Sequence, residues 1–224
     1  MPMLDLTKAL ELNLEKAQIF TPIIMSVKLA VDKSGSMQDE FSCGWVQDTL
    51  DLFLAAAMKF DDDGKMEIGF FNTSFDRTPD MTVDDAHTYI RDKAIYASGG
   101  TNFADAIKGL KGQATKRGLF GFGAAKPVTP TYLALITDGE NNDKREFEAQ
   151  LDSLENTFVQ IVAIGNGCNR RYLDQVAAKY DTVEVLYLPN PKAVDQNRFY
   201  ELLLNEEFKA FATKQVVDNM RAIR

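Results

Sequence analysis

Short apolar runs alternate along this chain with longer segments whose apolar residues recur at helical spacing. Five runs rich in β-branched and aliphatic residues predict strands. The predicted strands are residues 23–31, 66–71, 132–137, 158–164 and 183–188, and the predicted helices between them are residues 45–60, 83–95 (a weaker pattern), 101–116, 144–154 and 171–179. Parallel strands need a crossover connection, usually a helix. This order therefore predicts an α/β fold with a doubly wound, mostly parallel sheet and helices on both faces.

The two ends of the chain add helices to this core. Leucines at helical spacing predict an amphipathic N-terminal helix within residues 1–21, and the aromatic-rich end predicts one or two helices within residues 195–224. No segment repeats with a period of 20–50 residues. We therefore expect a single domain over residues 1–224, with its core at about residues 22–188 and a polar loop at residues 72–80.

Charge and composition exclude several classes of protein. A formal charge of −8 argues against a nucleic-acid partner and is compatible with binding a cation. The longest strongly apolar run, residues 52–58, is far shorter than the ~18 residues of a membrane span, and charges among the first leucines exclude a signal peptide. Cys43 and Cys168 form no CxxC pair. We expect reduced thiols rather than a disulfide, and hence a cytoplasmic protein.

An oxygen-rich turn, Asp32-Lys33-Ser34-Gly35-Ser36, follows the first predicted strand directly. A carboxylate and two hydroxyls at alternate positions can point at one cation, and such hard, mostly neutral oxygens suit magnesium or calcium better than zinc or copper. The alternative is a simple cap on the following helix, because Asp and Ser are favoured at helix N-termini.

Two further oxygen-bearing residues are expected at the same edge of the sheet. Asp138 comes directly after a predicted strand, and Thr101 immediately precedes a helix. In this architecture, ligands sit at the carboxyl ends of the strands. Taken alone, Thr101 would be an N-cap and Asp138-Gly139 an ordinary turn. Together with Asp32, Ser34 and Ser36, they predict one metal site.

These three motifs in this order resemble a von Willebrand factor A-type (vWA) domain with a metal-ion-dependent adhesion site (MIDAS). The resemblance covers roughly residues 22–188. Within it, residues 72–82 and 135–141 are similar to the bacterial and phage vWA domains grouped with tellurium-resistance factors. The resemblance implies a Rossmann-like vWA fold and a tellurium-resistance or stress-response context.

The resemblance also implies a role for each ligand. Asp32 would anchor the metal, directly or through water, and Ser34 and Ser36 would bind it directly. Thr101 and Asp138 would alternate between direct and water-mediated contact. Mg²⁺ is the expected ion, with Ca²⁺ and Mn²⁺ as alternatives, and at least one position stays open for water or an incoming ligand. An Asp or Glu carboxylate of a partner protein would complete the coordination.

Three functions compete at this stage. The first is a divalent-metal-dependent protein-binding module, which is not an enzyme. The second is a magnesium-dependent phosphoryl-transfer or hydrolytic enzyme with Asp32 as nucleophile. Against the enzyme hypothesis, the chain contains no GxxxxGK[ST] loop and no positioned general base. Its only histidine, His87, is expected at the surface rather than in a catalytic role. The third, a nucleic-acid scaffold, is disfavoured by the acidic charge.

Two polar segments near these motifs remain to be placed. Residues 140–143 would form the rim of the site, where they either tune the choice of partner or are merely an exposed polar loop. Residues 106–137 contain no acidic residue, and the basic loop at residues 112–127 should lie at the end of the sheet opposite the metal. It is either a second binding surface for an acidic partner or a solvated loop.

Overall fold

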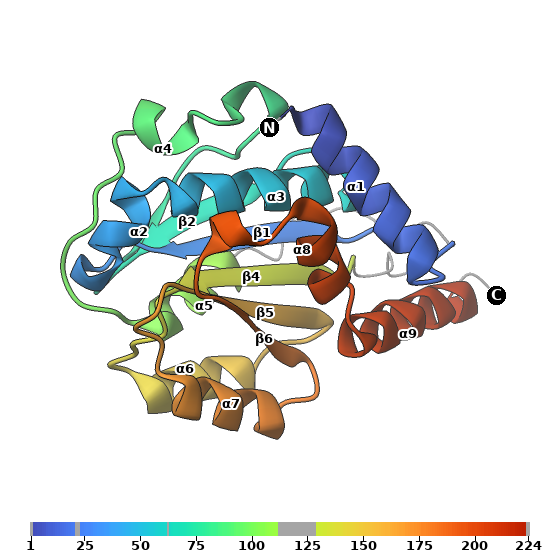
Figure 1. Cartoon of the computed structure of the whole chain (residues 1–224). Coiled ribbons are helices and arrows are strands. Elements are labelled where there is room, and N and C mark those ends of the chain that lie inside the picture. Colours follow the sequence, from blue (N-terminus) through green and yellow to red (C-terminus); the bar gives the residue numbers. More distant parts are fainter. Residues whose placement is uncertain (1, 21–22, 62, 112–128, 223–224) are drawn as a thin grey trace, which may run out of the picture.

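A computed structural model describes residues 2–20, 23–61, 63–111 and 129–222, with the side chains of the last helix described as far as Gln215 (Figure 1). One six-stranded sheet runs through it, in the order β3-β2-β1-β4-β5-β6. The strands are β1 (Ser26–Asp32), β2 (Glu67–Phe71), β3 (Phe75–Arg77), β4 (Thr131–Thr137), β5 (Thr157–Ile164) and β6 (Val183–Leu188). All neighbours pair in parallel except β2 and β3. The predicted α/β fold with a mostly parallel sheet is confirmed.

Strand β3 corrects the prediction of a polar loop at residues 72–80. It pairs with β2 in the antiparallel direction, and Gly69 of β2 lies opposite Arg77. A Cβ on Gly69 would come within 2.1 Å of the ring of Phe75, so the missing side chain makes room for that ring. Three residues with two charges carry no readable alternation, which is why the sequence pattern did not reveal this edge strand.

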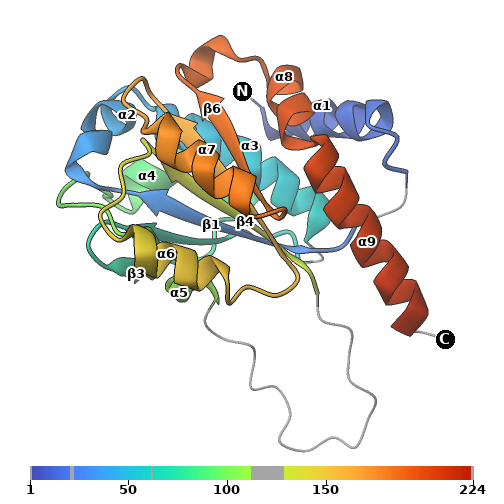
Figure 2. The same cartoon turned by 90° about the horizontal axis from the view of Figure 1, so that it is seen from below.

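Helices cover both faces of the sheet (Figures 1 and 2). One face packs against α1, α3, α8 and α9, and the other packs against α5, α6 and α7. The α-helices are α1 (Met3–Lys16), α2 (Gln38–Ser42), α3 (Trp45–Phe60), α4 (Tyr89–Asp92), α5 (Phe103–Lys111), α6 (Lys144–Leu151), α7 (Arg170–Lys179), α8 (Gln196–Leu203) and α9 (Glu206–Ala222). Alternate strand residues face opposite sides, so Val27 and Leu29 contact one layer while Ala30 contacts the other.

Two helical predictions need adjustment. The weak pattern at residues 83–95 forms only a 3-10 turn at Val83–Asp85 and the single-turn helix α4. The helix predicted for residues 101–116 begins at Phe103, and its described part ends at Lys111. The proposed second surface at residues 112–127 lies outside the described residues. Within those residues, we find no helix with the length and apolar character needed to cross a membrane.

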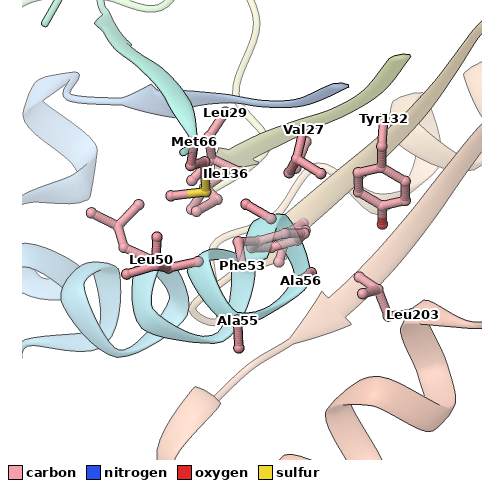
Figure 3. Packing of buried hydrophobic residues seen from close by; sticks show 14 of the residues in the cluster. Val27, Leu29, Leu50, Phe53, Ala55, Ala56, Met66, Tyr132, Ile136 and Leu203 are labelled. Carbon is pink, nitrogen blue, oxygen red and sulfur yellow. The ribbon is translucent and has the colours of Figure 1, made fainter. Parts of the chain in front are cut away.

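The rings of Phe53 and Tyr132 lie among aliphatic side chains in the larger core (Figure 3). Phe53 of α3 is completely buried, and its ring meets Phe199 edge to face at a centroid distance of 5.5 Å and Tyr132 at 6.2 Å. Phe208 of α9 packs edge to face on Tyr132 at 5.5 Å. The described aromatic residues of the C-terminal helices are therefore part of the core, and α3 is covered on more than one side.

We expect Phe53→Ala to lower the free energy of unfolding by about 3–5 kcal/mol, because it leaves a cavity between the sheet and α8. Urea denaturation followed by circular dichroism measures the change. Phe20→Ala is the control, since that ring is 76% exposed, and it should change stability by no more than about 0.5 kcal/mol. Equal effects of the two substitutions would contradict this packing.

Candidate functional site

Three turns meet at the carboxyl ends of the parallel strands, beside α2 in Figure 1. The turn at Asp32 follows β1, and the turn at Asp138 follows the neighbouring strand β4. The turn at Thr101 precedes α5. Each carries at least one predicted ligand. How these turns are held together decides whether the five residues can act on one ion.

Asp32 is completely buried at the end of β1. One carboxylate oxygen accepts the backbone N–H of Ser34 at 2.8 Å, and the other accepts the hydroxyl of Thr137 at 2.7 Å. Burial raises the pKa of Asp32 to about 7, although the hydrogen bonds from Ser34 and Thr137 lower it, and the negative charge of Asp138 raises it further. The carboxylate is therefore fixed in position but holds its negative charge at a cost.

The two serines of the motif place their hydroxyls side by side. The Oγ atoms of Ser34 and Ser36 are 3.1 Å apart. Neighbouring ligands of an octahedral Mg²⁺ are also about 3 Å apart, given bond lengths of about 2.1 Å. Ser34 is buried, whereas Ser36 is exposed. The hydroxyl pair thus has a spacing that suits a small cation. It reaches solvent at the carboxyl-end edge of the sheet, where the three turns meet, and we call this region the pole.

Backbone hydrogen bonds tie the Thr101 turn to the Asp32 turn. The N–H of Gly35 donates to the carbonyl of Gly99 at 2.9 Å, and the N–H of Ser98 donates to the carbonyl of Lys33 at 2.6 Å. Gly99 has a φ of +85°, a conformation that residues with a side chain rarely adopt. This turn brings Thr101, which is 3% exposed, to the same pole.

The Asp138 turn is joined to both of the others. The N–H of Gly139 donates to the Oγ1 atom of Thr137 at 3.0 Å, and that hydroxyl in turn donates to Asp32. The N–H of Asn142 donates to the carbonyl of Thr101 at 3.0 Å. The structure therefore brings the turns of all five predicted ligands to one pole, although these residues are spread over 107 positions of the chain.

Residues 140–143 are more than an exposed rim. Asn141 is 8% exposed, and the carboxylate of Asp143 accepts the backbone N–H groups of Phe103 at 2.9 Å and Ala104 at 3.0 Å. Asp143 thus caps α5, the helix that follows Thr101. Sequence reasoning missed this role because an aspartate directly before Lys144 looks like the cap of its own helix, α6.

A further buried carboxylate, Glu40 of α2, was not predicted. It is 8% exposed, one of its oxygens has no hydrogen-bond partner among the described residues, and burial raises its pKa. Its other oxygen would lie 2.2 Å from a Cβ on Gly165, so it packs directly over that glycine. Among the described residues, none of the three buried carboxylates at this pole (Asp32, Asp138 and Glu40) forms an ion pair with a lysine, arginine or histidine.

Hydroxyl ligands are essential to any metal site here. Within the described part of the chain, no three His, Cys, Asp or Glu side chains gather in a way that could hold a metal ion. A cation at this pole would therefore depend on serine and threonine oxygens. Those ligands neutralise little charge, so the cation would keep a strong attraction for an external carboxylate.

Sequence comparison identifies one matching family and one related protein. The profile of the family described as "vWA-TerF-like: vWA found in TerF C terminus" matches residues 24–218. The uncharacterized protein YcbR of Bacillus subtilis (strain 168) is 26% identical over 211 residues, which are 89% of this chain and 82% of that protein.

Solved structures with the same fold are more distant. Proximal thread matrix protein 1 from the mussel byssus superposes with a TM-score of 0.58 at 18% identity, covering 81% of this chain and 48% of the mussel chain. The chain thus spans about half the length of that neighbour. The TRAP protein of Plasmodium vivax superposes with a TM-score of 0.55 at 16% identity, covering 80% of this chain and 73% of TRAP. At this identity, the likeness concerns the fold.

Asp32→Asn is expected to stabilise the metal-free protein at pH 8. Folding raises the pKa of Asp32 from 3.8 to about 7, so the folded state holds this proton more tightly than the unfolded chain. The contribution of Asp32 to metal-free stability therefore falls as the pH rises from 3.8 to about 7, by up to about 4 kcal/mol. Asparagine carries no charge and removes this loss.

Urea denaturation in EDTA, followed from about pH 4 to about pH 8, measures the effect. The two proteins should have similar stability at the acidic end, and the variant should be more stable at the alkaline end. A variant that is less stable than the wild type at pH 8 would refute this account of the buried charge.

Proposed function

This chain belongs to the vWA-TerF-like family, and on that basis we propose that it is a divalent-metal-dependent protein-binding module. The cation is held at the pole by the five residues Asp32, Ser34, Ser36, Thr101 and Asp138. When bound, it supplies a positive charge that attracts a carboxylate of an Asp or Glu residue on a partner protein. We further propose that residues 1–224 act as one domain, since helices from both ends contribute to the larger core.

The main support for this proposal is a group of buried carboxylates that have no positively charged partner. Asp32, Asp138 and Glu40 are buried at one pole and have no cationic side chain as a partner within the described residues. Burying a carboxylate without a counter-charge is unfavourable. A divalent cation bound beside them would offset that penalty.

The chemistry of the donors favours Mg²⁺. Carboxylate and hydroxyl oxygens are hard ligands, and the 3.1 Å spacing of the Ser34 and Ser36 hydroxyls fits octahedral coordination. The mussel protein has also been solved with a zinc-occupied MIDAS motif, and TRAP has been solved loaded with manganese. Two proteins of this fold thus bind other divalent ions, and we expect Mn²⁺ to bind here as well.

An enzymatic role for Asp32 receives little support. Both of its oxygens are engaged, and its side chain is fully buried, so it is poorly placed to attack a substrate. His87 contacts the buried carboxylate of Asp51 on α3 rather than any of the five residues. We therefore propose binding rather than catalysis, in the cytoplasm of a bacterium or phage-infected cell, in a tellurium-resistance or stress-response setting.

Removing the anchoring carboxylate should abolish metal binding. We expect Asp32→Ala to weaken Mg²⁺ and Mn²⁺ binding by at least about 100-fold, which corresponds to ~2.7 kcal/mol, as measured by isothermal titration calorimetry. Asp181→Ala is the control, because this carboxylate is exposed and lies outside the pole. The proposed site would be wrong if the two variants bound the ions equally well.

Capture of a partner should depend on the cation. The wild-type chain, immobilised in cell lysate, should retain a protein in Mg²⁺ that it releases in EDTA, and Asp32→Ala should retain none of it. Mass spectrometry identifies what is retained. A retained set that is unchanged by EDTA and by the substitution would contradict the proposed mechanism.

A further inference from the structure

Helices α6 and α7 both begin with a pair of basic residues. Lys144 and Arg145 open α6, and Arg170 and Arg171 open α7. The N-terminus of a helix carries a partial positive charge, so cations there are unfavourable and anions are favoured. Two neighbouring helices thus begin with positively charged side chains, which interact unfavourably with the helix dipole.

None of these four cations is neutralised by the protein. All four side chains are exposed, and none forms an ion pair with another described residue. Lys144 lies over the ring of Tyr172 at 4.6 Å from its centroid, and Arg170 lies over the ring of Tyr187 at 4.3 Å. Those contacts position the cations without cancelling their charge.

The natural cap of α6 is used elsewhere. Asp143 occupies its N-cap position but makes no capping hydrogen bond to it, because the carboxylate accepts the N–H groups of Phe103 and Ala104 in α5. Helix α7 is capped by the neutral amide of Asn169. The first turn of α7 contains no acidic residue, whereas α6 has Glu146 in its first turn beside the basic pair. An added negative charge is therefore favoured most at the start of α7.

The two helix ends share a hollow of about 440 Å³. Lys144 lines it from α6, and Arg171 and Tyr172 line it from α7. The one carboxylate in its lining, Glu148, is already paired with Lys179 at 2.7 Å. Tyr172 also lines the hollow and is only 7% exposed, so its ring forms part of the wall. The hollow is thus lined by two cations, and its single carboxylate is paired with another residue.

This hollow adjoins the candidate metal site. A Cβ on Gly139 would lie 3.0 Å from the backbone nitrogen of Asn169, so the turn after Asp138 packs directly on the residue that precedes α7. Gly139 adopts a φ of +89°, which lets the turn make this close approach. A chain segment anchored at Asp138 would therefore reach α7 within a few residues.

We propose that Lys144, Arg145, Arg170 and Arg171, which we name the basic rim, bind acidic side chains that flank the metal-bound carboxylate of the partner. This proposal rests on the proposed function and narrows the partner to a protein segment with several Asp or Glu residues. A nucleic acid fits less well, because it has no carboxylate for the proposed cation, and the net charge of −8 disfavours a long polyanion.

Fluorescence anisotropy with labelled peptides tests the proposal on the full chain. The probes are a hexaglutamate peptide and a serine-glycine peptide of equal length with a single glutamate, each measured in Mg²⁺ and in EDTA. We expect hexaglutamate to bind about tenfold more tightly than the single-glutamate peptide in Mg²⁺, as two exposed ion pairs would provide. The Lys144→Gln/Arg171→Gln double variant should lose that preference.

A matched control removes the same charge elsewhere. Lys16 and Lys65 are exposed and form no ion pair with a described residue, so Lys16→Gln/Lys65→Gln should keep the preference. The rim variant should also melt about 1–3 °C higher, because it relieves the unfavourable charge at two helix ends. If the rim variant binds hexaglutamate more weakly but unfolds at a higher temperature, the weaker binding cannot be the result of a damaged fold.

The outcomes distinguish the two proposals. If EDTA and Asp32→Ala leave binding of the single-glutamate peptide unchanged, the metal-dependent function fails. The rim would then still appear as salt-sensitive binding of hexaglutamate that the rim variant loses. Equal affinities of the wild type for the two peptides, an unchanged preference in the rim variant, or tighter binding of a single-stranded oligonucleotide of equal charge would overturn the basic rim as a site for acidic protein segments.

Discussion

The carboxylate of Asp32 lies at the end of a central strand and forms no ion pair with a described residue. Its two oxygens are held by the N–H of Ser34 and the hydroxyl of Thr137, so β1 and β4 end at a common point. That hydroxyl also accepts the N–H of Gly139, which starts the next turn. Satisfying this one buried group therefore fixes the turns after β1 and β4 relative to each other.

Several features of the pole are unfavourable for the stability of the folded protein. Asp32 and Glu40 are buried carboxylates whose pKa values burial raises. Asp143 leaves α6 without a capping side chain in order to cap α5, and basic pairs stand at the starts of α6 and α7. Departures of this kind gather where a protein binds something, because the ligand supplies the missing interactions. We propose that the missing interactions here are of two kinds, a cation for the carboxylates and anions for the basic rim.

Periodicity located most of the fold but failed where contacts override it. The α3 helix lies where its apolar pattern placed it, and the five longer strands differ from the predicted runs by only a few residues. The short strand β3 was missed because its pairing depends on the space left by Gly69 rather than on alternation. Residues 83–95 show a weak helical pattern yet form only two short turns. In that segment, His87 has a φ of +66° and its backbone donates to Asp51.

From the sequence alone, the order of strands and helices and the identity of five oxygen-bearing residues could be inferred. Both depend on local sequence. Side-chain spacing predicts the strands and helices, and residues that directly follow parallel strands are expected at the same edge of the sheet. Only the tertiary structure decided which partners those residues have. Asp143 caps a helix 40 residues before it, and Lys144 and Arg171 come to line one hollow. Such contacts join residues far apart in the chain, and no spacing rule encodes them.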